Sequence, residues 1–351
     1  MHMKHFKFFG KQDILSRTRS RRYETRLGEK LGIVEKPDAL QDSLAGSPAR
    51  YVLFGIPESI GVQANFGIGG TETAWPKFLD AFFNIQSIDR FTGEEVIVAG
   101  AFDFSEVMQV IESHSRDASE KVDACRHAVS NIIDEEVEQL VRTIVAAGKV
   151  PLVIGGGHNN CYPIIKGVAK ALHKKGLTDK PQVNAVNLDA HADFRIMEGR
   201  HSGNGFRYAM EEGFLGKYAV IGLHENHNPQ SMVDDLYSRV NIQYSFFEDI
   251  FLHGKTGFTD AMAQAFSFIE ERPSVVELDL DAVEGVLSSA FTPSGISAMH
   301  ARQYVNFAGS YPNVAALHIC EGAERLGNGA VYEPVGKLIS YLVSDFLKSN
   351  G

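Results

Sequence analysis

The chain has 351 residues, of which 44% are hydrophobic and 22% are charged, a composition typical of globular proteins with a sizeable core. Its formal net charge of -10 argues against a general nucleic-acid-binding role, because such proteins normally carry a basic balance. Its three cysteines do not suggest a disulfide framework, and no apolar run approaches the roughly 20 residues of a membrane span. With no convincing signal peptide, we expect a cytoplasmic protein with neither nucleic-acid nor membrane partners.

Residues 1–49 are polar and irregular, and we interpret them as an N-terminal extension of a main domain that covers residues 50–351. From residue 50 onward, short runs rich in Val and Ile alternate with longer patterns of helical period. The runs predict strands at 51–56, 150–156, 183–188, 218–223, 274–280 and 314–319. The helical patterns lie at 121–148, 161–175, 257–271, 299–308 and 333–348. This alternation predicts an α/β fold with a mostly parallel sheet.

Four of the predicted strands end in polar residues. This is informative because proteins with an open parallel sheet bind their ligands outside the carboxyl ends of the strands. The segments that follow these strands are GGGH (155–158), DAHAD (189–193), DLD (279–281) and CEG (320–322). Side chains two residues apart in an extended segment point the same way, so Asp189, His191 and Asp193 share one face. Asp279 and Asp281 repeat this arrangement on another strand.

Four carboxylates that converge at the edge of a buried sheet repel one another, and burial of even one unpaired carboxylate costs several kcal/mol. A lone Asp-x-Asp is most simply a cap or a loop acid, but DAHAD, DLD and GGGH together, each at the end of a predicted strand, favour two divalent cations. The oxygen and nitrogen ligands, without thiolate, suit manganese or another hard divalent ion. Such ions lower the pKa of water enough to make a nucleophile, so the predicted reaction class is metal-assisted hydrolysis.

The three motifs, in this order, resemble those of the ureohydrolase family, which contains arginase, agmatinase and formimidoylglutamase. The resemblance covers roughly residues 50–345. It implies a three-layer α/β/α fold with a mostly parallel sheet of about eight strands, two Mn²⁺ ions and a homo-oligomer. By the same resemblance, one ion is held by His158, Asp189, Asp193 and Asp279, and the other by Asp189, His191, Asp279 and Asp281.

The resemblance also implies catalytic roles. Asp193 is expected to hydrogen-bond the hydroxide between the ions, and Glu321 to bind the nitrogens of an amidine or guanidine substrate. His201 lies beside the position of the proton shuttle of agmatinases, although a loop role suits it equally well. His224 and His227 are candidates either for the pocket lining or for the core.

The segment SGNGFR (202–207) and the glycine before His158 are nearer to formimidoylglutamase than to the other members. N-formimidoyl-L-glutamate carries two carboxylates, which cationic or amide side chains would bind. We therefore predict Asn204 and Arg207 as substrate-binding residues, with Arg195, Arg200 and Arg325 also near the motifs. The expected reaction yields L-glutamate and formamide, a step of histidine degradation.

Some residues depart from the family pattern. Asn159 and Asn160 are not the usual residues after the Gly-Gly-x-His turn, Glu277 stands where a serine is common, and Glu284-Gly285 replaces Asp-Pro. None of these changes removes a predicted ligand. They leave open an agmatinase, an arginase or another guanidino-acid hydrolase, or a metal-binding homologue without catalysis.

Overall fold

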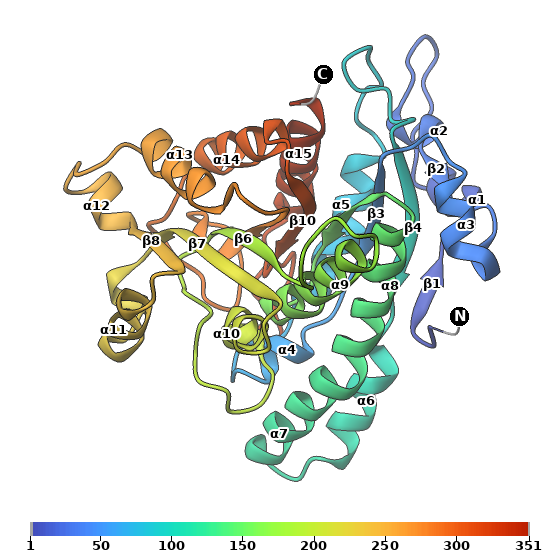
Figure 1. Cartoon of the computed structure of the whole chain (residues 1–351). Helices are drawn as coiled ribbons and strands as arrows, with labels where there is room; N and C mark the ends of the chain where they lie inside the picture. Colours follow the sequence, from blue (N-terminus) through green and yellow to red (C-terminus); the bar gives the residue numbers. More distant parts are fainter. Residues whose placement is uncertain (1–2, 350–351) are drawn as a thin grey trace.

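The computed structural model describes residues 3–349, which form a central sheet covered by helices on both faces (Figure 1). The strands are β1 (Phe6–Phe8), β2 (Gly32–Ile33), β3 (Tyr51–Gly55), β4 (Val96–Phe102), β5 (Val150–Ile154), β6 (Val183–Leu188), β7 (Leu215–Leu223), β8 (Ile242–Phe246), β9 (Ser274–Asp279) and β10 (Val314–Cys320). Their order in the sheet is β1-β4-β3-β5-β10-β9-β6-β7-β8, and β2 also pairs with β4. All neighbours are parallel except β1 and β4.

Helices alternate with the strands along most of the chain, as the sequence predicts. They are α1 (Lys11–Leu15), α2 (Leu27–Lys30), α3 (Leu40–Ala45), α4 (Ile60–Gln63), α5 (Ala74–Phe82), α6 (Ser105–His114), α7 (Ala118–Ala128), α8 (Asp134–Ala146), α9 (Cys161–Lys174), α10 (Gly205–Glu211), α11 (Gln230–Ser238), α12 (Phe247–Phe251), α13 (Phe258–Ile269), α14 (Ala298–Ser310) and α15 (Val335–Lys348). Within residues 3–349, none of these helices has the length and apolarity needed to cross a membrane.

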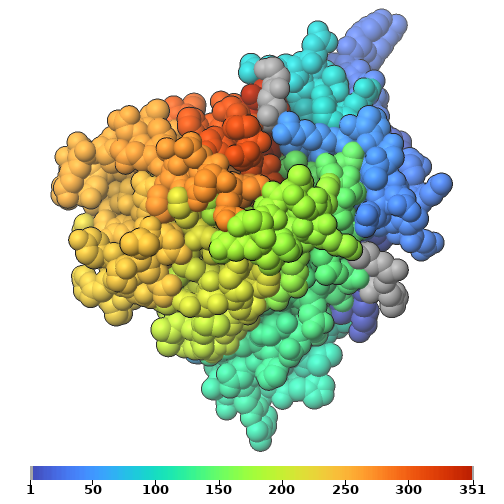
Figure 2. All heavy atoms as spheres, viewed as in Figure 1, coloured from blue at the N-terminus to red at the C-terminus, as the bar shows by residue number. Residues whose placement is uncertain are grey.

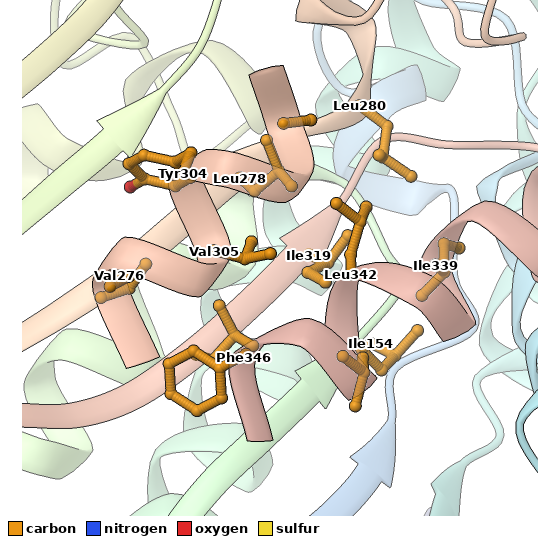
Figure 3. Packing of buried hydrophobic residues seen from close by; sticks show 14 of the residues in the cluster. Ile154, Val276, Leu278, Leu280, Tyr304, Val305, Ile319, Ile339, Leu342 and Phe346 are labelled. Atoms are coloured by element: carbon orange, nitrogen blue, oxygen red, sulfur yellow. The ribbon is translucent and has the colours of Figure 1, made fainter. Parts of the chain in front are cut away.

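Two apolar clusters, one on each face of the sheet, make the fold a three-layer α/β/α structure. One cluster packs the sheet against α5, α13, α14 and α15, and the other packs it against α3, α7, α8, α9 and α10. Figure 3 shows part of the first cluster, where Val276 and Leu278 of β9 and Ile319 of β10 meet Val305 of α14 and Leu342 of α15. Alternate residues of each strand therefore reach opposite cores, which explains the continuous apolar runs in the sequence.

The six predicted strands and the fold class are confirmed, but the sheet has ten strands among the described residues instead of about eight. The prediction omitted β4, whose run VIVAGAF contains three small residues, and β8, which is half-exposed. It also omitted β1 and β2, two short strands within the polar segment 1–49. Both pair with β4, so this segment adds an edge to the sheet, and Figure 2 shows it in blue on the right-hand side of the molecule.

The predicted helix 121–148 is divided into two helices by a π-helical segment, Val129–Ile133. α7 starts at the N-cap Asp117, whose side chain accepts a hydrogen bond from Glu120 N, and α8 continues to Ala146. The helices α6 and α7 form the projection at the bottom of Figure 1. A π-helical turn inserts an extra residue into the helical repeat, which apolar periodicity over a short window does not reveal.

Candidate metal centre

The four strands that end in polar residues are neighbours at the middle of the sheet, in the order β5-β10-β9-β6. Because they are parallel, the segments after them meet at one edge, which is the topology that the sequence prediction requires. His158 follows β5, Glu321 follows β10, Asp279 ends β9, and Asp189 follows β6. The chain turns sharply after both aspartates. Asp189 Oδ1 accepts from the amide of His191 and Asp279 Oδ1 from the amide of Asp281, each at 2.7 Å.

The first ligand group contains His158, Asp189, Asp193 and Asp279, whose potential donor atoms all lie within 4.8 Å of one another. His158 Nδ1 lies 2.8 Å from Asp193 Oδ2, 3.1 Å from Asp279 Oδ2 and 3.2 Å from Asp189 Oδ2. The imidazole of His158 is completely buried, and Asp193, the most exposed of the four, is only 9% exposed. One nitrogen and three carboxylates therefore face a common point inside the protein.

The second group contains Asp189, His191 and Asp281, again with donor atoms within 4.8 Å of one another. His191 Nδ1 lies 3.0 Å from Asp281 Oδ2 and 3.7 Å from Asp189 Oδ1. Asp189 belongs to both groups, so its two oxygens lie between them. The structure thus brings together the six side chains predicted as metal ligands. Asp279 belongs to the first group only, and the carboxylate of Asp281 in the second group is close enough to act on its pKa.

The electrostatics of these groups fit divalent cations. Burial, followed by the charge of Asp189, raises the pKa of Asp193 to about 6. Burial and the charges of Asp281 and Asp189 raise the pKa of Asp279 well above its ordinary value. His158 Nδ1 is close to three carboxylate oxygens but has no partner with hydrogen-bond geometry among the described residues, and Asp281 Oδ1 is likewise buried without one. Cations would neutralise this excess charge and would satisfy the unpaired atoms, since buried polar atoms are normally paired.

A third group with ligand spacing, formed by His158, His318 and Cys320, lies beside the first. Burial raises the pKa of the Cys320 thiol well above its ordinary value, and His318 is already hydrogen-bonded through both ring nitrogens. Metal ligation by cysteine requires the thiolate. This group therefore fits a cation less well than the two carboxylate-rich groups.

Two residues of the centre have strained backbones. Asp193 and Glu321 have φ angles of 46° and 61°, in the left-handed region that residues other than glycine rarely adopt. Holding a residue in this conformation costs of order 1–3 kcal/mol, and such strained residues concentrate at functional sites. Position 156 requires glycine for two reasons. Its φ angle is 80°, and a Cβ there would lie only 2.8 Å from Ile56 O.

Glu58 holds the loop before His158 in place, and the sequence analysis did not identify it. Its buried carboxylate accepts hydrogen bonds from Gly61 N, Gly157 N, Asn159 Nδ2 and Asn160 Nδ2, at 3.0, 3.1, 3.3 and 2.8 Å. The two asparagines that depart from the family pattern are thus partners of this glutamate. The two asparagines after His158 were a sequence signal that a buried acceptor lies nearby. The sequence could not identify this acceptor as Glu58, because Glu58 precedes α4 and meets the loop only in the folded chain.

A cavity of about 220 Å³ opens beside the centre. It is lined by His191, Asp193, Asp279, Asp281 and Glu321, together with Asn65, Arg195, Ser202, Gly203, His227 and Asn228. The His227 ring stacks on His191 with centroids 4.8 Å apart, so it is this histidine, rather than His224, that borders the cavity. Asn228 supports the DAHAD loop, since it accepts from Ala192 N and donates to Ala190 O, both at 3.0 Å.

Glu321 is a buried acid that lines this cavity. Its Oε1 accepts a hydrogen bond from His158 N at 2.8 Å. Burial, and then the charge of Asp281, raises the pKa of Glu321 to about 8. A cationic group in the cavity would favour the charged form of Glu321, because a nearby opposite charge lowers the pKa of an acid.

Three residues predicted for catalysis or substrate binding lie away from the cavity. His201 is fully buried, its Nδ1 accepts from Gly203 N at 3.1 Å, and burial lowers its pKa to about 4. Asn204 donates to Gly199 O and accepts from Arg200 Nη1. Arg207 donates to Asp235 and to Phe194 O.

His201 and Asn204 point away from the cavity because of a short helical turn at Ser202–Asn204. The sequence analysis did not predict this turn. It presents Ser202 and Gly203 to the cavity and directs the side chains of His201 and Asn204 into the protein. The cavity-lining arginine is Arg195, whose side chain is 52% exposed. Of the residues predicted for catalysis or substrate binding, His201, Asn204 and Arg207 are therefore not among those that line this cavity.

Comparisons with known proteins agree with this architecture. The formimidoylglutamase of Macrococcus caseolyticus is 33% identical over 167 residues, which are 47% of this chain and 48% of that protein. The formimidoylglutamase of Geobacillus thermodenitrificans is 26% identical over 195 residues, which are 53% and 56% of the two proteins. The matched segment thus spans about half the length of the curated relatives.

Two crystal structures share the fold over nearly the whole chain. The formiminoglutamase of Trypanosoma cruzi with Mn²⁺ has a TM-score of 0.69 at 20% identity, and covers 93% of this chain and 98% of its own. The formimidoylglutamase of Bacillus subtilis has a TM-score of 0.70 at 17% identity, with coverages of 94% and 93%. Residues 51–329 match the family model described as the Arginase family. These residues are most of the chain and contain all the ligand motifs, so the chain belongs to the arginase family.

Proposed function

We propose that this protein is a binuclear manganese hydrolase that cleaves N-formimidoyl-L-glutamate to L-glutamate and formamide. The observation that carries the proposal is the pair of ligand groups beside a cavity that is lined by four of the six predicted metal ligands, His191, Asp193, Asp279 and Asp281, together with Glu321 and Arg195. Two carboxylate-rich ligand groups that share Asp189 suit two hard divalent ions. Ions bound there supply Lewis acidity and lower the pKa of water, which makes it nucleophilic near neutral pH.

The remaining residues of the cavity bind and orient the substrate. The Glu321 carboxylate pairs with the cationic formimidoyl group and holds its carbon near the two ligand groups. Arg195 lies in the same cavity with an exposed guanidinium, which suits two-point binding of a substrate carboxylate. Asn65 and Ser202, which also line the cavity, add neutral hydrogen-bonding groups. A substrate with one cationic and one anionic end therefore matches the lining.

In the proposed reaction, the oxygen of water adds to the formimidoyl carbon, and the bond from this carbon to the glutamate nitrogen breaks. The glutamate nitrogen takes up a proton, and the carbon leaves as formamide. The similarity to the formimidoylglutamases of Macrococcus caseolyticus and Geobacillus thermodenitrificans supports this substrate over agmatine or arginine. The reaction would place the protein in histidine degradation. By the family resemblance we further propose that it acts in the cytoplasm as a homo-oligomer.

A substrate panel tests the proposal. Purified protein loaded with Mn²⁺ is offered N-formimidoyl-L-glutamate, agmatine, arginine and guanidino acids, and formamide, ammonia and urea are measured. We expect formamide from the first substrate only. Release of urea from agmatine or arginine alone would refute the choice of substrate, and no turnover despite full Mn²⁺ occupancy would identify a non-catalytic homologue.

Two matched substitutions of aspartate separate the centre from general effects of lost charge. Asp281→Asn removes a side chain of the second ligand group and should abolish turnover. Asp260→Asn removes an exposed carboxylate from the first turn of α13, which belongs to neither ligand group, and should leave turnover unchanged. Equal activities of the two variants would contradict the assignment of the centre.

A further inference from the structure

A second cavity, of about 560 Å³, lies where the N-terminal segment meets the last helix. Its wall is formed by residues of segment 1–49, by α5 and the loop that follows it, and by α15. Among the described residues, none lines both this cavity and the one beside the metal centre. The proposed hydrolysis therefore does not use the second cavity. Its volume is typical of sites for small molecules, which measure about 300–1,000 Å³.

The charge on the wall of the second cavity is positive. Arg19 and Arg26 line it from the N-terminal segment, and Lys337 and Lys348 line it from α15, whereas no acidic residue of the described chain does so. Arg26 is paired with Glu24, but no carboxylate within residues 3–349 forms an ion pair with any of the other three. Three positive charges without a counter-charge thus surround one cavity, in a chain whose net charge is -10. Like charges repel, so an anion between them would be favoured.

Arg26 is held rigidly at the wall of this cavity. Its side chain is only 13% exposed, and its guanidinium donates to Asn84 O at 2.9 Å and to Glu24 Oε2 at 2.5 Å. Gln86 Nε2 donates to the same Glu24 oxygen at 2.8 Å, which fixes the carboxylate in turn. Arg26 Nε is buried without a hydrogen-bond partner among the residues that the structure describes, although buried N–H groups are normally paired. A donor group that is already fixed loses little entropy when a ligand binds.

The wall suits a phosphorylated ligand better than a carboxylate. A phosphoryl group carries about 1.5 to 2 negative charges at neutral pH and has three strong acceptor oxygens. It can therefore bind several arginine and lysine side chains at once, through charge-assisted hydrogen bonds. A single carboxylate has one negative charge, which would leave most of the positive charge uncompensated. Ile85 and Ile88 line the same cavity and offer apolar surface to the carbon skeleton of a ligand.

We propose that this cavity is a second binding site of the protein, which takes an organic phosphate with two or more negative charges. The bound anion joins the N-terminal segment to α15, because Arg19 belongs to the first and Lys337 to the second. The site also accounts for Arg19 within the basic stretch 17–22, where Arg17 is instead paired with Asp80. The inference is independent of the proposed hydrolysis.

Isothermal titration calorimetry of the whole Mn²⁺-loaded protein tests the proposal. The probes are adenosine 3′,5′-bisphosphate and fructose 1,6-bisphosphate, which distinguish a nucleotide from a sugar phosphate as the source of the phosphoryl groups. Adenosine is the uncharged control. We expect at least one bisphosphate to bind and adenosine not to bind. Failure of both bisphosphates to bind, or equal binding of adenosine, would overturn the inference.

Removal of single charges locates the bound phosphate. Lys337→Gln should weaken bisphosphate binding about tenfold, and the double variant Arg19→Gln/Lys337→Gln about 100-fold, because each substitution removes one charge-assisted hydrogen bond. Lys174→Gln is the matched control, since Lys174 is an exposed lysine at the end of α9, which packs on the other face of the sheet. It should leave the affinity unchanged. Equal affinities of Lys337→Gln and Lys174→Gln would place the phosphate elsewhere, for example at the metal centre, and would overturn the inference.

A contact between subunits is the other explanation for unpaired cations, and the same proteins test it. Sedimentation velocity of the wild-type protein and of Arg19→Gln/Lys337→Gln should give the same oligomeric state. Their melting temperatures should also agree, because both side chains are exposed and unpaired. A change of oligomeric state in the double variant, together with no bisphosphate binding by the wild-type protein, would assign these cations to a subunit interface and overturn the inference.

Discussion

Arg207 of α10 donates a hydrogen bond to the Asp235 carboxylate of α11, and its guanidinium lies 4.3 Å from the centroid of the Phe194 ring. It also donates to Phe194 O at 3.1 Å. These contacts use the guanidinium to join two helices to the loop that follows Asp193. Arg195, only one residue beyond Phe194, instead faces the cavity. The two arginines thus have separate roles, one in stability and one in the proposed substrate binding.

The substitution Arg207→Gln should lower the free energy of unfolding by about 1–3 kcal/mol, because it leaves the Asp235 carboxylate with fewer donors. The KM for formimidoylglutamate should remain within about twofold of the wild-type value, since Arg207 does not reach the cavity. Urea unfolding and steady-state kinetics check the two outcomes. A large increase in KM at unchanged stability would contradict this placement of Arg207.

Arg195→Gln, in contrast to Arg207→Gln, should raise the KM and leave the stability of the protein nearly unchanged. Loss of a charge-assisted hydrogen bond to the substrate costs about 1.5–3 kcal/mol, which corresponds to a KM increase of about 10- to 100-fold. The melting temperature should hardly change, because the Arg195 side chain is half-exposed and its ion pair with Glu198 is on the surface. Kinetics with formimidoylglutamate and thermal melts of both arginine variants provide the measurement. An unchanged KM would remove Arg195 from the site.

Removal of metal should destabilise the protein. Chelation leaves Asp189, Asp193, Asp279 and Asp281 crowded without neutralising cations. An ion that binds only the folded state adds about 2.7 kcal/mol of stability at a concentration 100 times its Kd. The melting temperature should therefore rise with added Mn²⁺ and fall in a chelator. Asp281→Asn should show a smaller response to Mn²⁺ than the wild-type protein does, and an identical response would argue against a stabilising centre at these residues.

Glu58→Gln should destabilise the loop before His158. The Glu58 carboxylate faces four N–H donors, and an amide in its place would point an NH₂ group at one of them. One unsatisfied buried donor costs about 1–3 kcal/mol. The exposed neighbour Glu72 provides the control, because Glu72→Gln should change stability by less than about 0.5 kcal/mol. Denaturant unfolding of both variants measures the difference, and equal effects would contradict the role of Glu58.

The buried carboxyl group of Asp134, which pairs with Arg200, should give the stability a dependence on pH. Burial outweighs the favourable charge of Arg200 and raises the pKa of Asp134 to about 6. The folded protein therefore binds more protons than the unfolded chain between about pH 4 and 6, and stability falls as the pH rises through this interval. The total loss is at most about 3 kcal/mol, since one pKa unit corresponds to about 1.36 kcal/mol.

The variant Asp134→Asn isolates this effect, because the other titrating groups are common to both proteins. As the pH rises from 4 to 6, the melting temperature of the wild-type protein should fall relative to that of the variant. Above pH 6 the difference should become constant. A constant difference over the whole range would mean that Asp134 titrates at its ordinary pKa despite its burial.

The amino-acid sequence by itself determined the six predicted strands and the residues at their ends. Strands buried on both faces must be apolar throughout, so the runs before His158, Asp189 and Asp279 were recognisable, and alternating acids mark one face of an extended segment. Only the tertiary structure decided which strands are neighbours, and hence that Glu277 and His318 meet across β9 and β10. It also decided the direction of His201, Asn204 and Arg207, because loop side chains follow the turn that carries them. The physical reason is that strand patterns depend on local burial, whereas contacts between segments depend on the path of the whole chain.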